Sequence, residues 1–421
     1  MRRAESVCYD GPMKICLISH AYPPEKLGGA EVYAERIAAA LAHKGHRVTV
    51  ITQAPFRGIT SLLPKKYTKN GISFYSFYPL NIFSIYQAHK KPLLAKALWR
   101  AIDLINPLPA LLVQGILKKE RPDIIHTQII HGFSPLFLFR AIKKIKIPLV
   151  QTIHSYGFLC FRCDLLRPSG RVCRRLPFFC RVFARISAAA IGGIPQAVIS
   201  PSKFCLLLHA EQGFFSQAKK IVLANGVALS DTLKENHNTI SRREFRIIFA
   251  GRLAKNKGAQ VLIGAFRKLA APQAKLIIAG EGNWENKLRR LCQGDKRIVF
   301  TGKLSAEEMR SLYASASLTV VPSLYYEPFG NCIIESLAAG VPVIASRIGG
   351  IPELIQEGSN GYLFEPGDRP GLKKLLERII LNPQQLEALS QNAFLSSRQY
   401  DLTKHIGELE KIYAEAKNVY A

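Results

Sequence analysis

The sequence predicts a chain of two α/β domains, each built on a mostly parallel sheet. Short β-rich apolar runs alternate with helical patterns from end to end, and this rhythm is typical of parallel sheets with helices on both faces. At 421 residues the chain is too long for one ordinary core, because a domain holds about 100 to 200 residues. A composition of 48% hydrophobic and 21% charged residues excludes collagen-like, low-complexity and wholly disordered chains.

A polar stretch divides the two predicted domains. Residues 226–243 lack an apolar period, so we predict a linker between Rossmann-like domains at 13–225 and 244–397. Residues 1–12 are polar and are predicted to be an N-terminal extension, and 398–421 contain an amphipathic helix. The predicted strands are Ile15–Ser19, Arg47–Thr52, Ile72–Phe77, Ile124–Thr127, Pro148–Ile153, Ala197–Ser200, Ile221–Leu223, Arg246–Ala250, Lys275–Ala279, Ile298–Phe300, Leu318–Val321 and Val343–Ala345.

The chain is strongly basic, and its charge is unevenly distributed. The 58 Lys and Arg residues against 30 Asp and Glu give a net charge of +28. Residues 1–225 hold 32 basic and 10 acidic residues, a net +22, whereas 226–421 hold 26 and 20, a net +6. Such a field attracts anionic partners, whether phosphates, nucleic acid or a lipid surface.

Neither a membrane span nor a disulfide framework is expected. The most apolar stretch, 104–117, is interrupted by polar residues and prolines and falls short of the roughly 20 apolar residues of a transmembrane helix. The N-terminus lacks a signal-peptide pattern. Nine cysteines, an odd number, favour reduced thiols in a cytosolic compartment.

Two loops that follow predicted strands suit a phosphate group. Gly28-Gly29 precede an amphipathic helix, and glycines there let backbone N–H groups approach a phosphate, although an ordinary turn is the alternative. After the strand that ends at Ala250, Arg252 and Lys257 lie five residues apart and could grip a diphosphate; a solvated loop is the alternative. This loop lacks the ordinary P-loop pattern.

A pair of glutamates forms the sharpest motif. Glu327 and Glu335 lie eight residues apart around a Pro-Phe-Gly turn. This spacing places Glu327 in the loop after a strand and Glu335 about one turn inside the next helix. Such an arrangement suits two polar parts of one extended ligand better than a general acid and base.

Taken together, these motifs resemble a known family. Gly28-Gly29, Arg252 with Lys257, Glu327 with Glu335, and the segment Gly349-Gly350-Ile-Pro-Glu353 look like those of glycosyltransferase family 4, retaining enzymes with the GT-B fold. The resemblance implies two Rossmann-like domains that face a central cleft, with the C-terminal helix packed on the first domain.

The resemblance also implies a role for each motif. Arg252 and Lys257 would hold the donor diphosphate, Glu335 the ribose, and Glu327 the hydroxyls of the transferred sugar. Gly28 and Gly29 would close over the diphosphate from the first domain. The backbone at a helix start would cradle sugar and phosphate through Phe329, Gly330 and Asn331.

Further site residues follow from the same resemblance. His154, after the strand Pro148–Ile153, matches a histidine that would touch the donor sugar near its reacting carbon. The family usually has His-Asp there, whereas this chain has His154-Ser155. Gly280, Glu281 and Thr301 match loops near the nucleotide base.

The implied activity is retaining transfer of a hexose-type sugar from a nucleotide-sugar, with UDP favoured over GDP. The acceptor would be a saccharide, either lipid-linked or part of a cell-surface glycan. The chain contains no Asp-x-Asp, consistent with Arg and Lys in place of a divalent metal, so no cofactor is expected to be required. The alternative is a catalytically silent GT-B relative that binds a sugar-nucleotide or an anionic polymer.

Four cysteines cluster after His154. Their spacing is Cys-x2-Cys-x9-Cys-x6-Cys among several arginines, so they could clamp a structural zinc ion. The spacing is not that of a standard zinc ribbon or finger, and four separate thiols are the alternative. The cysteines are Cys160, Cys163, Cys173 and Cys180.

The basic segments of the first domain suggest a partner. An apolar and basic stretch, 90–119, lies in the same half of the chain as Lys143-Lys144-Ile-Lys146 and the arginines near the cysteines. Docking to anionic lipid headgroups is one hypothesis and a buried helical hairpin is the other. We therefore expect a cytoplasmic protein, which on the first hypothesis is peripheral at the inner face of the cell membrane. No nucleic-acid partner is expected, because no recognised nucleic-acid-binding signature is present.

Overall fold

The computed structural model describes residues 11–23, 28–167, 169–229 and 244–420, and it divides into two compact units. Unit 1 contains the chain up to Leu165, then Arg174–Ala224 and the chain from Thr403 onward. Unit 2 contains Leu166–Cys173 and Asn225–Leu402. Residues 230–243 of the predicted linker and 1–10 of the predicted extension lie outside the described residues.

Unit 1 is built on an eight-stranded sheet in the order β3-β4-β2-β1-β5-β6-β7-β8. All neighbouring strands pair in parallel except β3, which pairs antiparallel with β4. The central strands are buried on both faces, as expected for a parallel sheet covered by helices. The strands are β1 (Lys14–Ile18), β2 (Arg47–Gln53), β3 (Lys65–Lys69), β4 (Ile72–Phe77), β5 (Ile124–Thr127), β6 (Leu149–Thr152), β7 (Ala197–Ser200) and β8 (Lys219–Val222).

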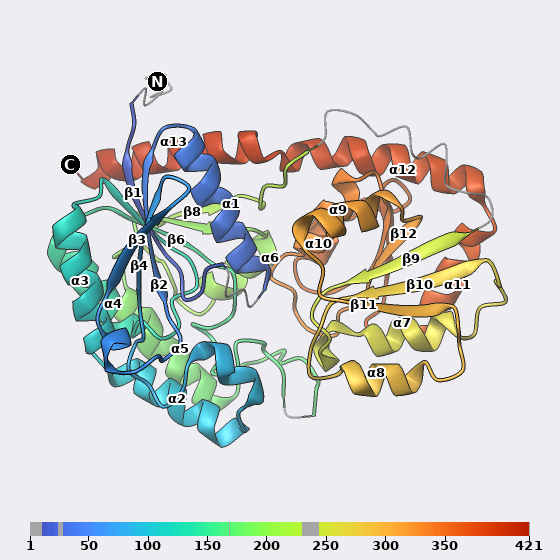
Figure 1. Cartoon of the computed structure of the whole chain (residues 1–421), viewed down its shortest axis with the longest axis horizontal. Helices are drawn as coiled ribbons and strands as arrows, with labels where there is room; N and C mark the ends of the chain where they lie inside the picture. The colour runs from blue at the N-terminus through green and yellow to red at the C-terminus, as the bar shows by residue number, and fades with distance from the viewer. Residues whose placement is uncertain (1–10, 24–27, 168, 230–243, 421) are drawn as a thin grey trace. The chain divides into compact units, whose positions relative to one another are not determined.

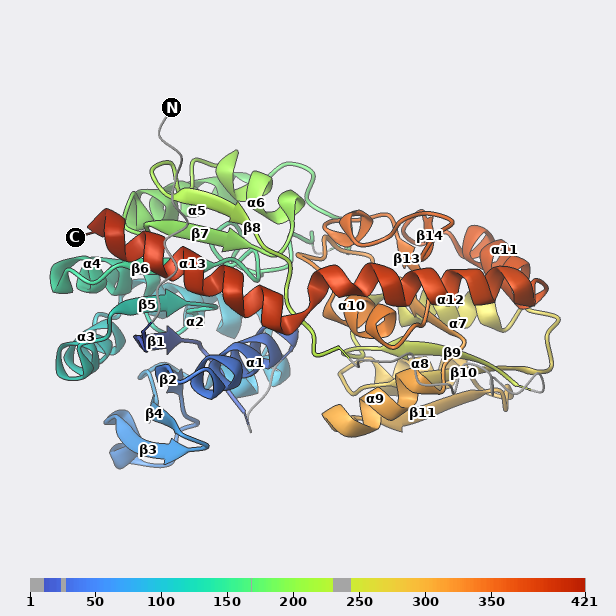
Figure 2. The ribbon, with the colours of Figure 1, turned by 90° about the horizontal axis from the view of Figure 1, so that it is seen from above.

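Helices cover both faces of this sheet. Figures 1 and 2 show α1 and α13 on one side of it and α2 to α5 on the other. Helix α4 packs against α2, α3 and α5. The helices are α1 (Gly29–His43), α2 (Leu93–Ile105), α3 (Leu108–Glu120), α4 (Pro135–Ile145), α5 (Phe178–Ile191), α6 (Lys203–Ala210) and α13 (Leu402–Tyr420), with short 3₁₀ turns at η1 (Ile59–Leu62) and η2 (Ile85–Lys90).

Within the described ranges, no single helix is both long and apolar enough to cross a membrane. The pair α2 and α3 would reach that length and composition only together, and the two helices bend by 47° where they meet.

Unit 2 holds a six-stranded, all-parallel sheet in the order β11-β10-β9-β12-β13-β14. Its strands are β9 (Phe245–Ala250), β10 (Ala274–Ala279), β11 (Ile298–Gly302), β12 (Leu318–Val321), β13 (Val343–Ser346) and β14 (Gly361–Phe364). Its helices are α7 (Ala259–Phe266), α8 (Glu285–Leu291), α9 (Ala306–Ala314), α10 (Asn331–Ala338), α11 (Arg369–Ile380) and α12 (Pro383–Ser397), with 3₁₀ turns at η4 (Lys255–Lys257), η5 (Ile351–Glu353) and η6 (Arg398–Tyr400).

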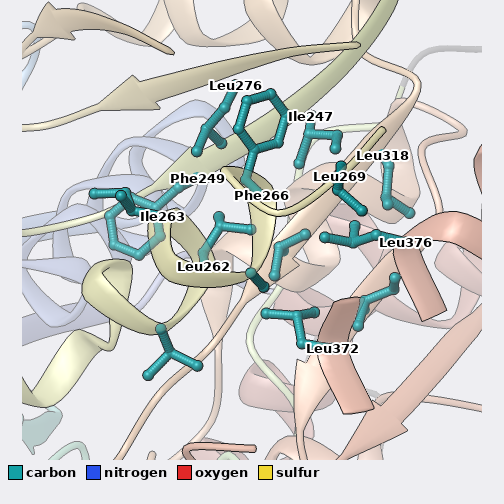
Figure 3. Close-up of a cluster of buried hydrophobic side chains, with 14 of the residues drawn as sticks. Ile247, Phe249, Leu262, Ile263, Phe266, Leu269, Leu276, Leu318, Leu372 and Leu376 are labelled. Atoms are coloured by element: carbon teal, nitrogen blue, oxygen red, sulfur yellow. The ribbon is translucent and has the colours of Figure 1, made fainter. Parts of the chain in front are cut away.

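The core of unit 2 lies between its sheet and two helices. Ile247 and Leu276 of the sheet pack against Phe266 of α7 and against Leu372 and Leu376 of α11. Figure 3 shows these side chains in one cluster. Helix α9 begins at a capping box, in which the Ser305 side chain accepts from the Glu308 backbone N–H and the Glu308 side chain accepts from the Ser305 backbone N–H. The sheet thus has a rigid backing, and its strand ends can hold loops in defined positions.

All twelve predicted strands are present, with ends shifted by at most two residues. Two strands were not predicted. Strand β3 is fully exposed and lysine-rich, as edge strands often are, so it carries no apolar alternation. Strand β14 is a short buried edge strand of only four residues.

Candidate functional site

The strand order of unit 2 reverses between β9 and β12. From β9 the chain proceeds to β10 and β11 on one side, and from β12 to β13 and β14 on the other. The loops after β9 and β12 therefore flank a topological switch point, where open parallel sheets bind ligands. Lys257 belongs to the first loop and Glu327 to the second, and Lys257 Nζ lies 2.7 Å from Glu327 Oε1.

Glu327 is held by three donors. The carboxylate is buried, with 6% of the residue exposed. Its Oε1 accepts from the Ser323 hydroxyl at 2.7 Å as well as from Lys257, and its Oε2 accepts from the Tyr325 hydroxyl at 2.6 Å. Burial alone would raise the pKa of Glu327, but the charge of Lys257 and these hydrogen bonds lower it below its usual value.

Lys257 is correspondingly held in its charged form. Its ammonium group lies 5.1 Å from the centre of the Tyr325 ring, a geometry that adds a cation–π contact. Burial would lower the pKa of Lys257, but the charge of Glu327 raises it well above its usual value. The site thus presents a fixed, charged Lys–Glu pair at neutral pH.

Two glycines allow the loops to approach this closely. Gly258 has φ +76°, and a Cβ there would lie 1.7 Å from the Pro322 carbonyl oxygen. Gly349, after β13, has φ +62°, and a Cβ there would lie 2.5 Å from the backbone N and O of Glu327. The next amide, Gly350 N–H, donates to the Glu327 carbonyl at 2.8 Å. Any larger residue at either glycine would push the loops apart.

Helix α10 begins directly after this loop. The Asn331 side chain accepts a hydrogen bond from the Asn225 amide at 2.8 Å. The Phe329 ring is buried and packs edge-on against Tyr400, so Phe329 is available to a ligand only through its backbone. Glu335 lies in the second turn, as its spacing predicted.

The other predicted residues of unit 2 also follow strand ends. Arg252 is exposed after β9, and no hydrogen bond or ion pair within the described ranges involves its guanidinium. Gly280 and Glu281 follow β10, and Glu281 forms an exposed ion pair with Lys303 at 3.5 Å. Thr301, at the end of β11, is exposed. The candidate residues of unit 2 therefore lie in the loops at the carboxyl edge of its sheet or in the first two turns of α10.

The predicted residues of unit 1 lie at the carboxyl edge of its own sheet. His154 follows β6 and donates from Nε2 to Gln128 Oε1 at 2.7 Å. Burial, followed by the charges of His405 and His20, lowers the pKa of His154 to about 3, so the ring is neutral. Gly28 precedes α1 and Gly29 is its first residue. Residues 24–27 of that loop lie outside the described residues.

Of the two interpretations of the four cysteines, the described part of the chain gives the zinc site no support. There, no group of three or more His, Cys, Asp or Glu side chains is arranged to hold a metal ion. Cys163 instead lies 3.4 Å from Arg100 Nη2 and 3.5 Å from His131 Nε2. Cys160, Cys163 and Cys180 belong to unit 1, and Cys173 belongs to unit 2.

Sequence reasoning missed the residues that hold the predicted ones in place. Ser323 and Tyr325 fix Glu327, Asn225 contacts Asn331, and Gln128 contacts His154. A usable signal existed for two of them: Gln128 directly follows a buried strand, and Ser323 follows β12 with a single proline between. Polar residues at such strand ends are placed to meet a ligand or one another.

Two family models together match most of the chain. Residues 231–395 match the family model "Glycosyl transferases group 1", and 27–231 match "Glycosyltransferase Family 4". An uncharacterized glycosyltransferase of Methanocaldococcus jannaschii, MJ1607, is 28% identical over 87% of this chain and 89% of its own. The sulfoquinovosyl transferase SQD2 of Arabidopsis thaliana is 34% identical over 68% of this chain and 55% of its own.

Solved structures share the fold over nearly the whole chain. Anabaena Alr3699/HepE in complex with UDP has a TM-score of 0.70 at 21% identity, and the match covers 96% of this chain and 100% of that one. Sucrose-phosphate synthase from Thermosynechococcus elongatus has a TM-score of 0.73 at 19% identity, over 95% and 98% of the two chains. The chain therefore belongs to the group 1 glycosyltransferases of family 4 and has the GT-B fold.

Proposed function

We propose that the protein is a retaining glycosyltransferase that moves a hexose-type sugar from a UDP-sugar to a saccharide acceptor, without a metal ion. The observation that carries the proposal is the Lys257–Glu327 pair at the switch point of unit 2. Such a pair offers a fixed cation for a diphosphate and a fixed carboxylate for sugar hydroxyls in one place.

The hydrogen bonds that Glu327 already accepts limit how many acceptor positions its carboxylate can offer to a sugar. Two carboxylate oxygens offer about four acceptor positions, and Lys257, Ser323 and Tyr325 occupy three of them. One position is left for a hydroxyl of the transferred sugar. Because the carboxylate is already fixed, that hydroxyl would be oriented without loss of side-chain freedom.

Arg252 and Lys257 would share the diphosphate in different ways. The Arg252 guanidinium is exposed and can turn to grip phosphate oxygens with its planar fork. Lys257 is fixed by Glu327 and would act as a point charge against the leaving group. Together they would neutralise the charge that develops on the nucleotide as the glycosidic bond breaks. Glu335 would bind the ribose, and the backbone of Phe329, Gly330 and Asn331 would cradle the sugar and phosphate.

The remaining site residues keep the roles suggested by their motifs. His154, Gly28 and Gly29 would act from unit 1, and Gly280, Glu281 and Thr301 would lie near the base. The solved structures of Anabaena Alr3699/HepE with UDP, with UDP and glucose, and with UDP-glucose support a UDP-sugar as the donor.

For the acceptor we propose a lipid-linked or cell-surface saccharide reached at an anionic membrane surface. Helices α2, α3 and α5 carry outward-facing apolar residues, including Leu94 at 82% exposure and Phe179 at 77%. The apolar residues of this docking face are Leu94, Leu98, Ile105, Leu108, Leu111, Phe178, Phe179, Val182 and Ile186. Exposed basic residues lie on α3, on α4 and its C-cap, in the loop before α5 and on α5 itself: Lys118, Lys119, Arg140, Lys143, Lys144, Lys146, Arg174, Arg175, Arg181 and Arg185.

The composition of this docking face favours lipid over an acidic protein. The chain has no acidic residue between Asp164 and Glu211, so nothing on α5 opposes an anionic surface. Apolar side chains interleaved with arginines are typical of an interfacial helix, and each basic residue near an anionic bilayer contributes about 1 kcal/mol. With this docking face, the protein would be cytoplasmic and would bind peripherally at the inner face of the cell membrane.

The donor is tested by thermal shift with UDP, GDP, ADP and dTDP. At about 100 times its dissociation constant a nucleotide stabilises by roughly 2.7 kcal/mol, and we expect the largest shift with UDP. Arg252→Ala and Glu335→Ala should reduce this shift by half or more, while Arg310→Ala, at an exposed arginine on α9, should leave it unchanged.

Transfer from UDP-glucose and other UDP-sugars, in the presence of EDTA, then tests the activity. A shift without any transfer would support the silent sugar-nucleotide binder instead, and no shift with any nucleotide would overturn both.

A further inference from the structure

A continuous chain of hydrogen bonds runs from His154 to the C-terminal helix. His154 Nε2 lies 2.7 Å from Gln128 Oε1, and Gln128 Nε2 lies 2.9 Å from His126 Nε2. His126 Nδ1 then lies 2.7 Å from the Tyr413 hydroxyl of α13. All four residues belong to unit 1, and His126, Gln128 and Tyr413 are fully or almost fully buried.

The orientation of the Gln128 amide gives this chain a direction. Its oxygen can only accept, so His154 Nε2 carries the proton and His154 Nδ1 carries the lone pair. Its nitrogen can only donate, so His126 Nε2 accepts and His126 Nδ1–H donates to Tyr413. The Thr152 hydroxyl also reaches His126 Nε2, at 2.6 Å. With the amide reversed, every proton in the chain would move to the opposite nitrogen.

A second contact fixes the plane of the His154 ring. The Tyr33 ring of α1 packs with its centroid 4.7 Å from that of His154. The Tyr33 hydroxyl donates to His405 Nε2 of α13 at 2.9 Å, because His405 Nδ1–H donates to the Ala224 carbonyl at 2.8 Å. Helix α13 therefore supports His154 at two points, through Tyr413 and through His405.

The surroundings keep the histidines neutral. The titratable groups around His154 are His126, His405 and His20, with the phenols of Tyr33 and Tyr413; His20 has its own partner, Glu31, at 3.2 Å. Burial is the main cause that lowers the pKa of His126 to about 3 and that of His405 to about 4. Neutral imidazoles joined through an amide can hold only one of two tautomer patterns.

We propose that Gln128, His126 and Tyr413 are positioning residues that hold His154 as the neutral Nε2–H tautomer, so that Nδ1 accepts a hydrogen bond from a hydroxyl of the bound sugar. Nδ1 has no partner of its own within the part of the chain that the structure describes. The proposal deepens the proposed function and rests on it. It separates His154 from a cationic role, because an imidazolium has no lone pair to offer.

The first test reads the tautomers directly. In the full chain labelled with ¹⁵N-histidine, which contains ten histidines, we expect His154 at pH 7 to show a protonated Nε2 and an unprotonated Nδ1, and His126 the reverse. A protonated Nδ1 or an imidazolium at His154 would overturn the proposal. This measurement needs no donor, so it stands whether or not a transferable sugar is found.

The second test replaces Gln128 with glutamate, which has the same shape. A carboxylate beside His154 raises the pKa of the imidazole, so the Gln128→Glu variant should carry an imidazolium near neutral pH and lose about tenfold or more in kcat/KM for UDP-glucose. As pH rises through that raised pKa, His154 loses its proton and activity should recover toward wild type. A merely structural residue would give a loss that does not change with pH.

Two further variants complete the test. Gln196→Glu places the same substitution at the opposite end of the same sheet and should leave the pH profile unchanged. Among the described residues, the Gln196 side chain hydrogen-bonds to the backbone of Leu149 and Ile194. If Gln128→Glu does not fold, Tyr413→Phe removes the last acceptor and should leave His154 as a mixture of tautomers. Wild-type protein that transfers no sugar would refute the proposed function alone. Transfer by a protein whose His154 is protonated at Nδ1 would refute this inference alone.

Discussion

Lys257 Nζ lies 2.7 Å from Glu327 Oε1 across the two loops that flank the switch point of unit 2. Each charge offsets part of the cost of burying the other. Glycines at 258 and 349 let the loops meet, and Ser323 and Tyr325 fill most of the remaining acceptor positions of the carboxylate. The strand order therefore brings the two loops together, and their contacts hold the two charges in fixed positions.

The first prediction concerns removal of one partner. Glu327→Gln should lower the free energy of unfolding by about 1–3 kcal/mol, below the usual cost of breaking a fully buried pair, because a quarter of the Lys257 side chain is exposed. The rate of sugar transfer should fall by more than the loss of folded protein explains. Thermal melting and transfer assays on the same preparation check this; a variant as stable and active as wild type would contradict it.

The second prediction is the pH dependence of that stability. Glu327 has a pKa below its ordinary 4.5 in the folded chain, so its contribution is present above that value and is lost as pH falls through the lowered folded-state pKa. Melting midpoints of wild type and Glu327→Gln should therefore converge between about pH 4.5 and pH 2, where other carboxylates also titrate. A gap of constant size across that range would show that the carboxylate charge is not what stabilises the loop.

The third prediction separates binding from folding. Because Arg252 is exposed and pairs with no other described residue, Arg252→Ala should leave the melting temperature of the free protein within about 1 °C. Loss of a charge-assisted hydrogen bond of about 1.5–3 kcal/mol should weaken nucleotide binding roughly 10- to 100-fold. Calorimetric titration with UDP measures this, with Arg310→Ala as the matched surface control; equal affinities would remove Arg252 from the site.

Most of the fold could be predicted because its signals are local. The buried strands β1, β5 and β12 are runs of apolar and β-branched residues bounded by polar ones, and such runs need no knowledge of their neighbours. Strand β3 could not be predicted, because its lysines and its register are explained only by its pairing with β4. The cysteine spacing left zinc and separate thiols both open, and within the described residues no group of side chains is arranged to hold a metal ion.

The candidate site divides in the same way. Arg252, Lys257, Glu327 and Glu335 stand out in the sequence, but the Lys257–Glu327 pair is 70 residues apart and depends on β9 and β12 being neighbours in the sheet. The link from His154 to Tyr413 joins residues still further apart. Contacts of this kind follow from topology, and no spacing rule in one sequence encodes them.

The fourth prediction tests the close approach at Gly349. Gly349→Ala should lower the free energy of unfolding for two reasons. The positive φ costs about 1–2 kcal/mol for a residue with a Cβ, and the added Cβ overlaps the backbone of Glu327. Gly358→Ala has the matching φ of +78° with no atom within 4 Å of the added Cβ, so it carries the first cost alone. We expect Gly349→Ala to melt lower than Gly358→Ala and to transfer sugar at least tenfold more slowly. Equal effects would show that the overlap is relieved elsewhere.

The last prediction concerns the docking face on α2, α3 and α5. Phe178 and Phe179 are 65% and 77% exposed, and full burial of such a side chain contributes about 1.5–3 kcal/mol. The double variant Phe178→Ser with Phe179→Ser should therefore reduce binding to vesicles of mixed anionic and zwitterionic lipids by about tenfold or more at any salt concentration.

Replacing Arg174, Arg175, Arg181 and Arg185 by Gln should reduce binding most at low salt, because screening already weakens those charges at high salt. Leu381→Ser, at an 80% exposed leucine of unit 2, is the control. If the wild type does not co-sediment with these vesicles at low salt, the membrane is removed from the proposed function and a soluble acceptor is to be sought.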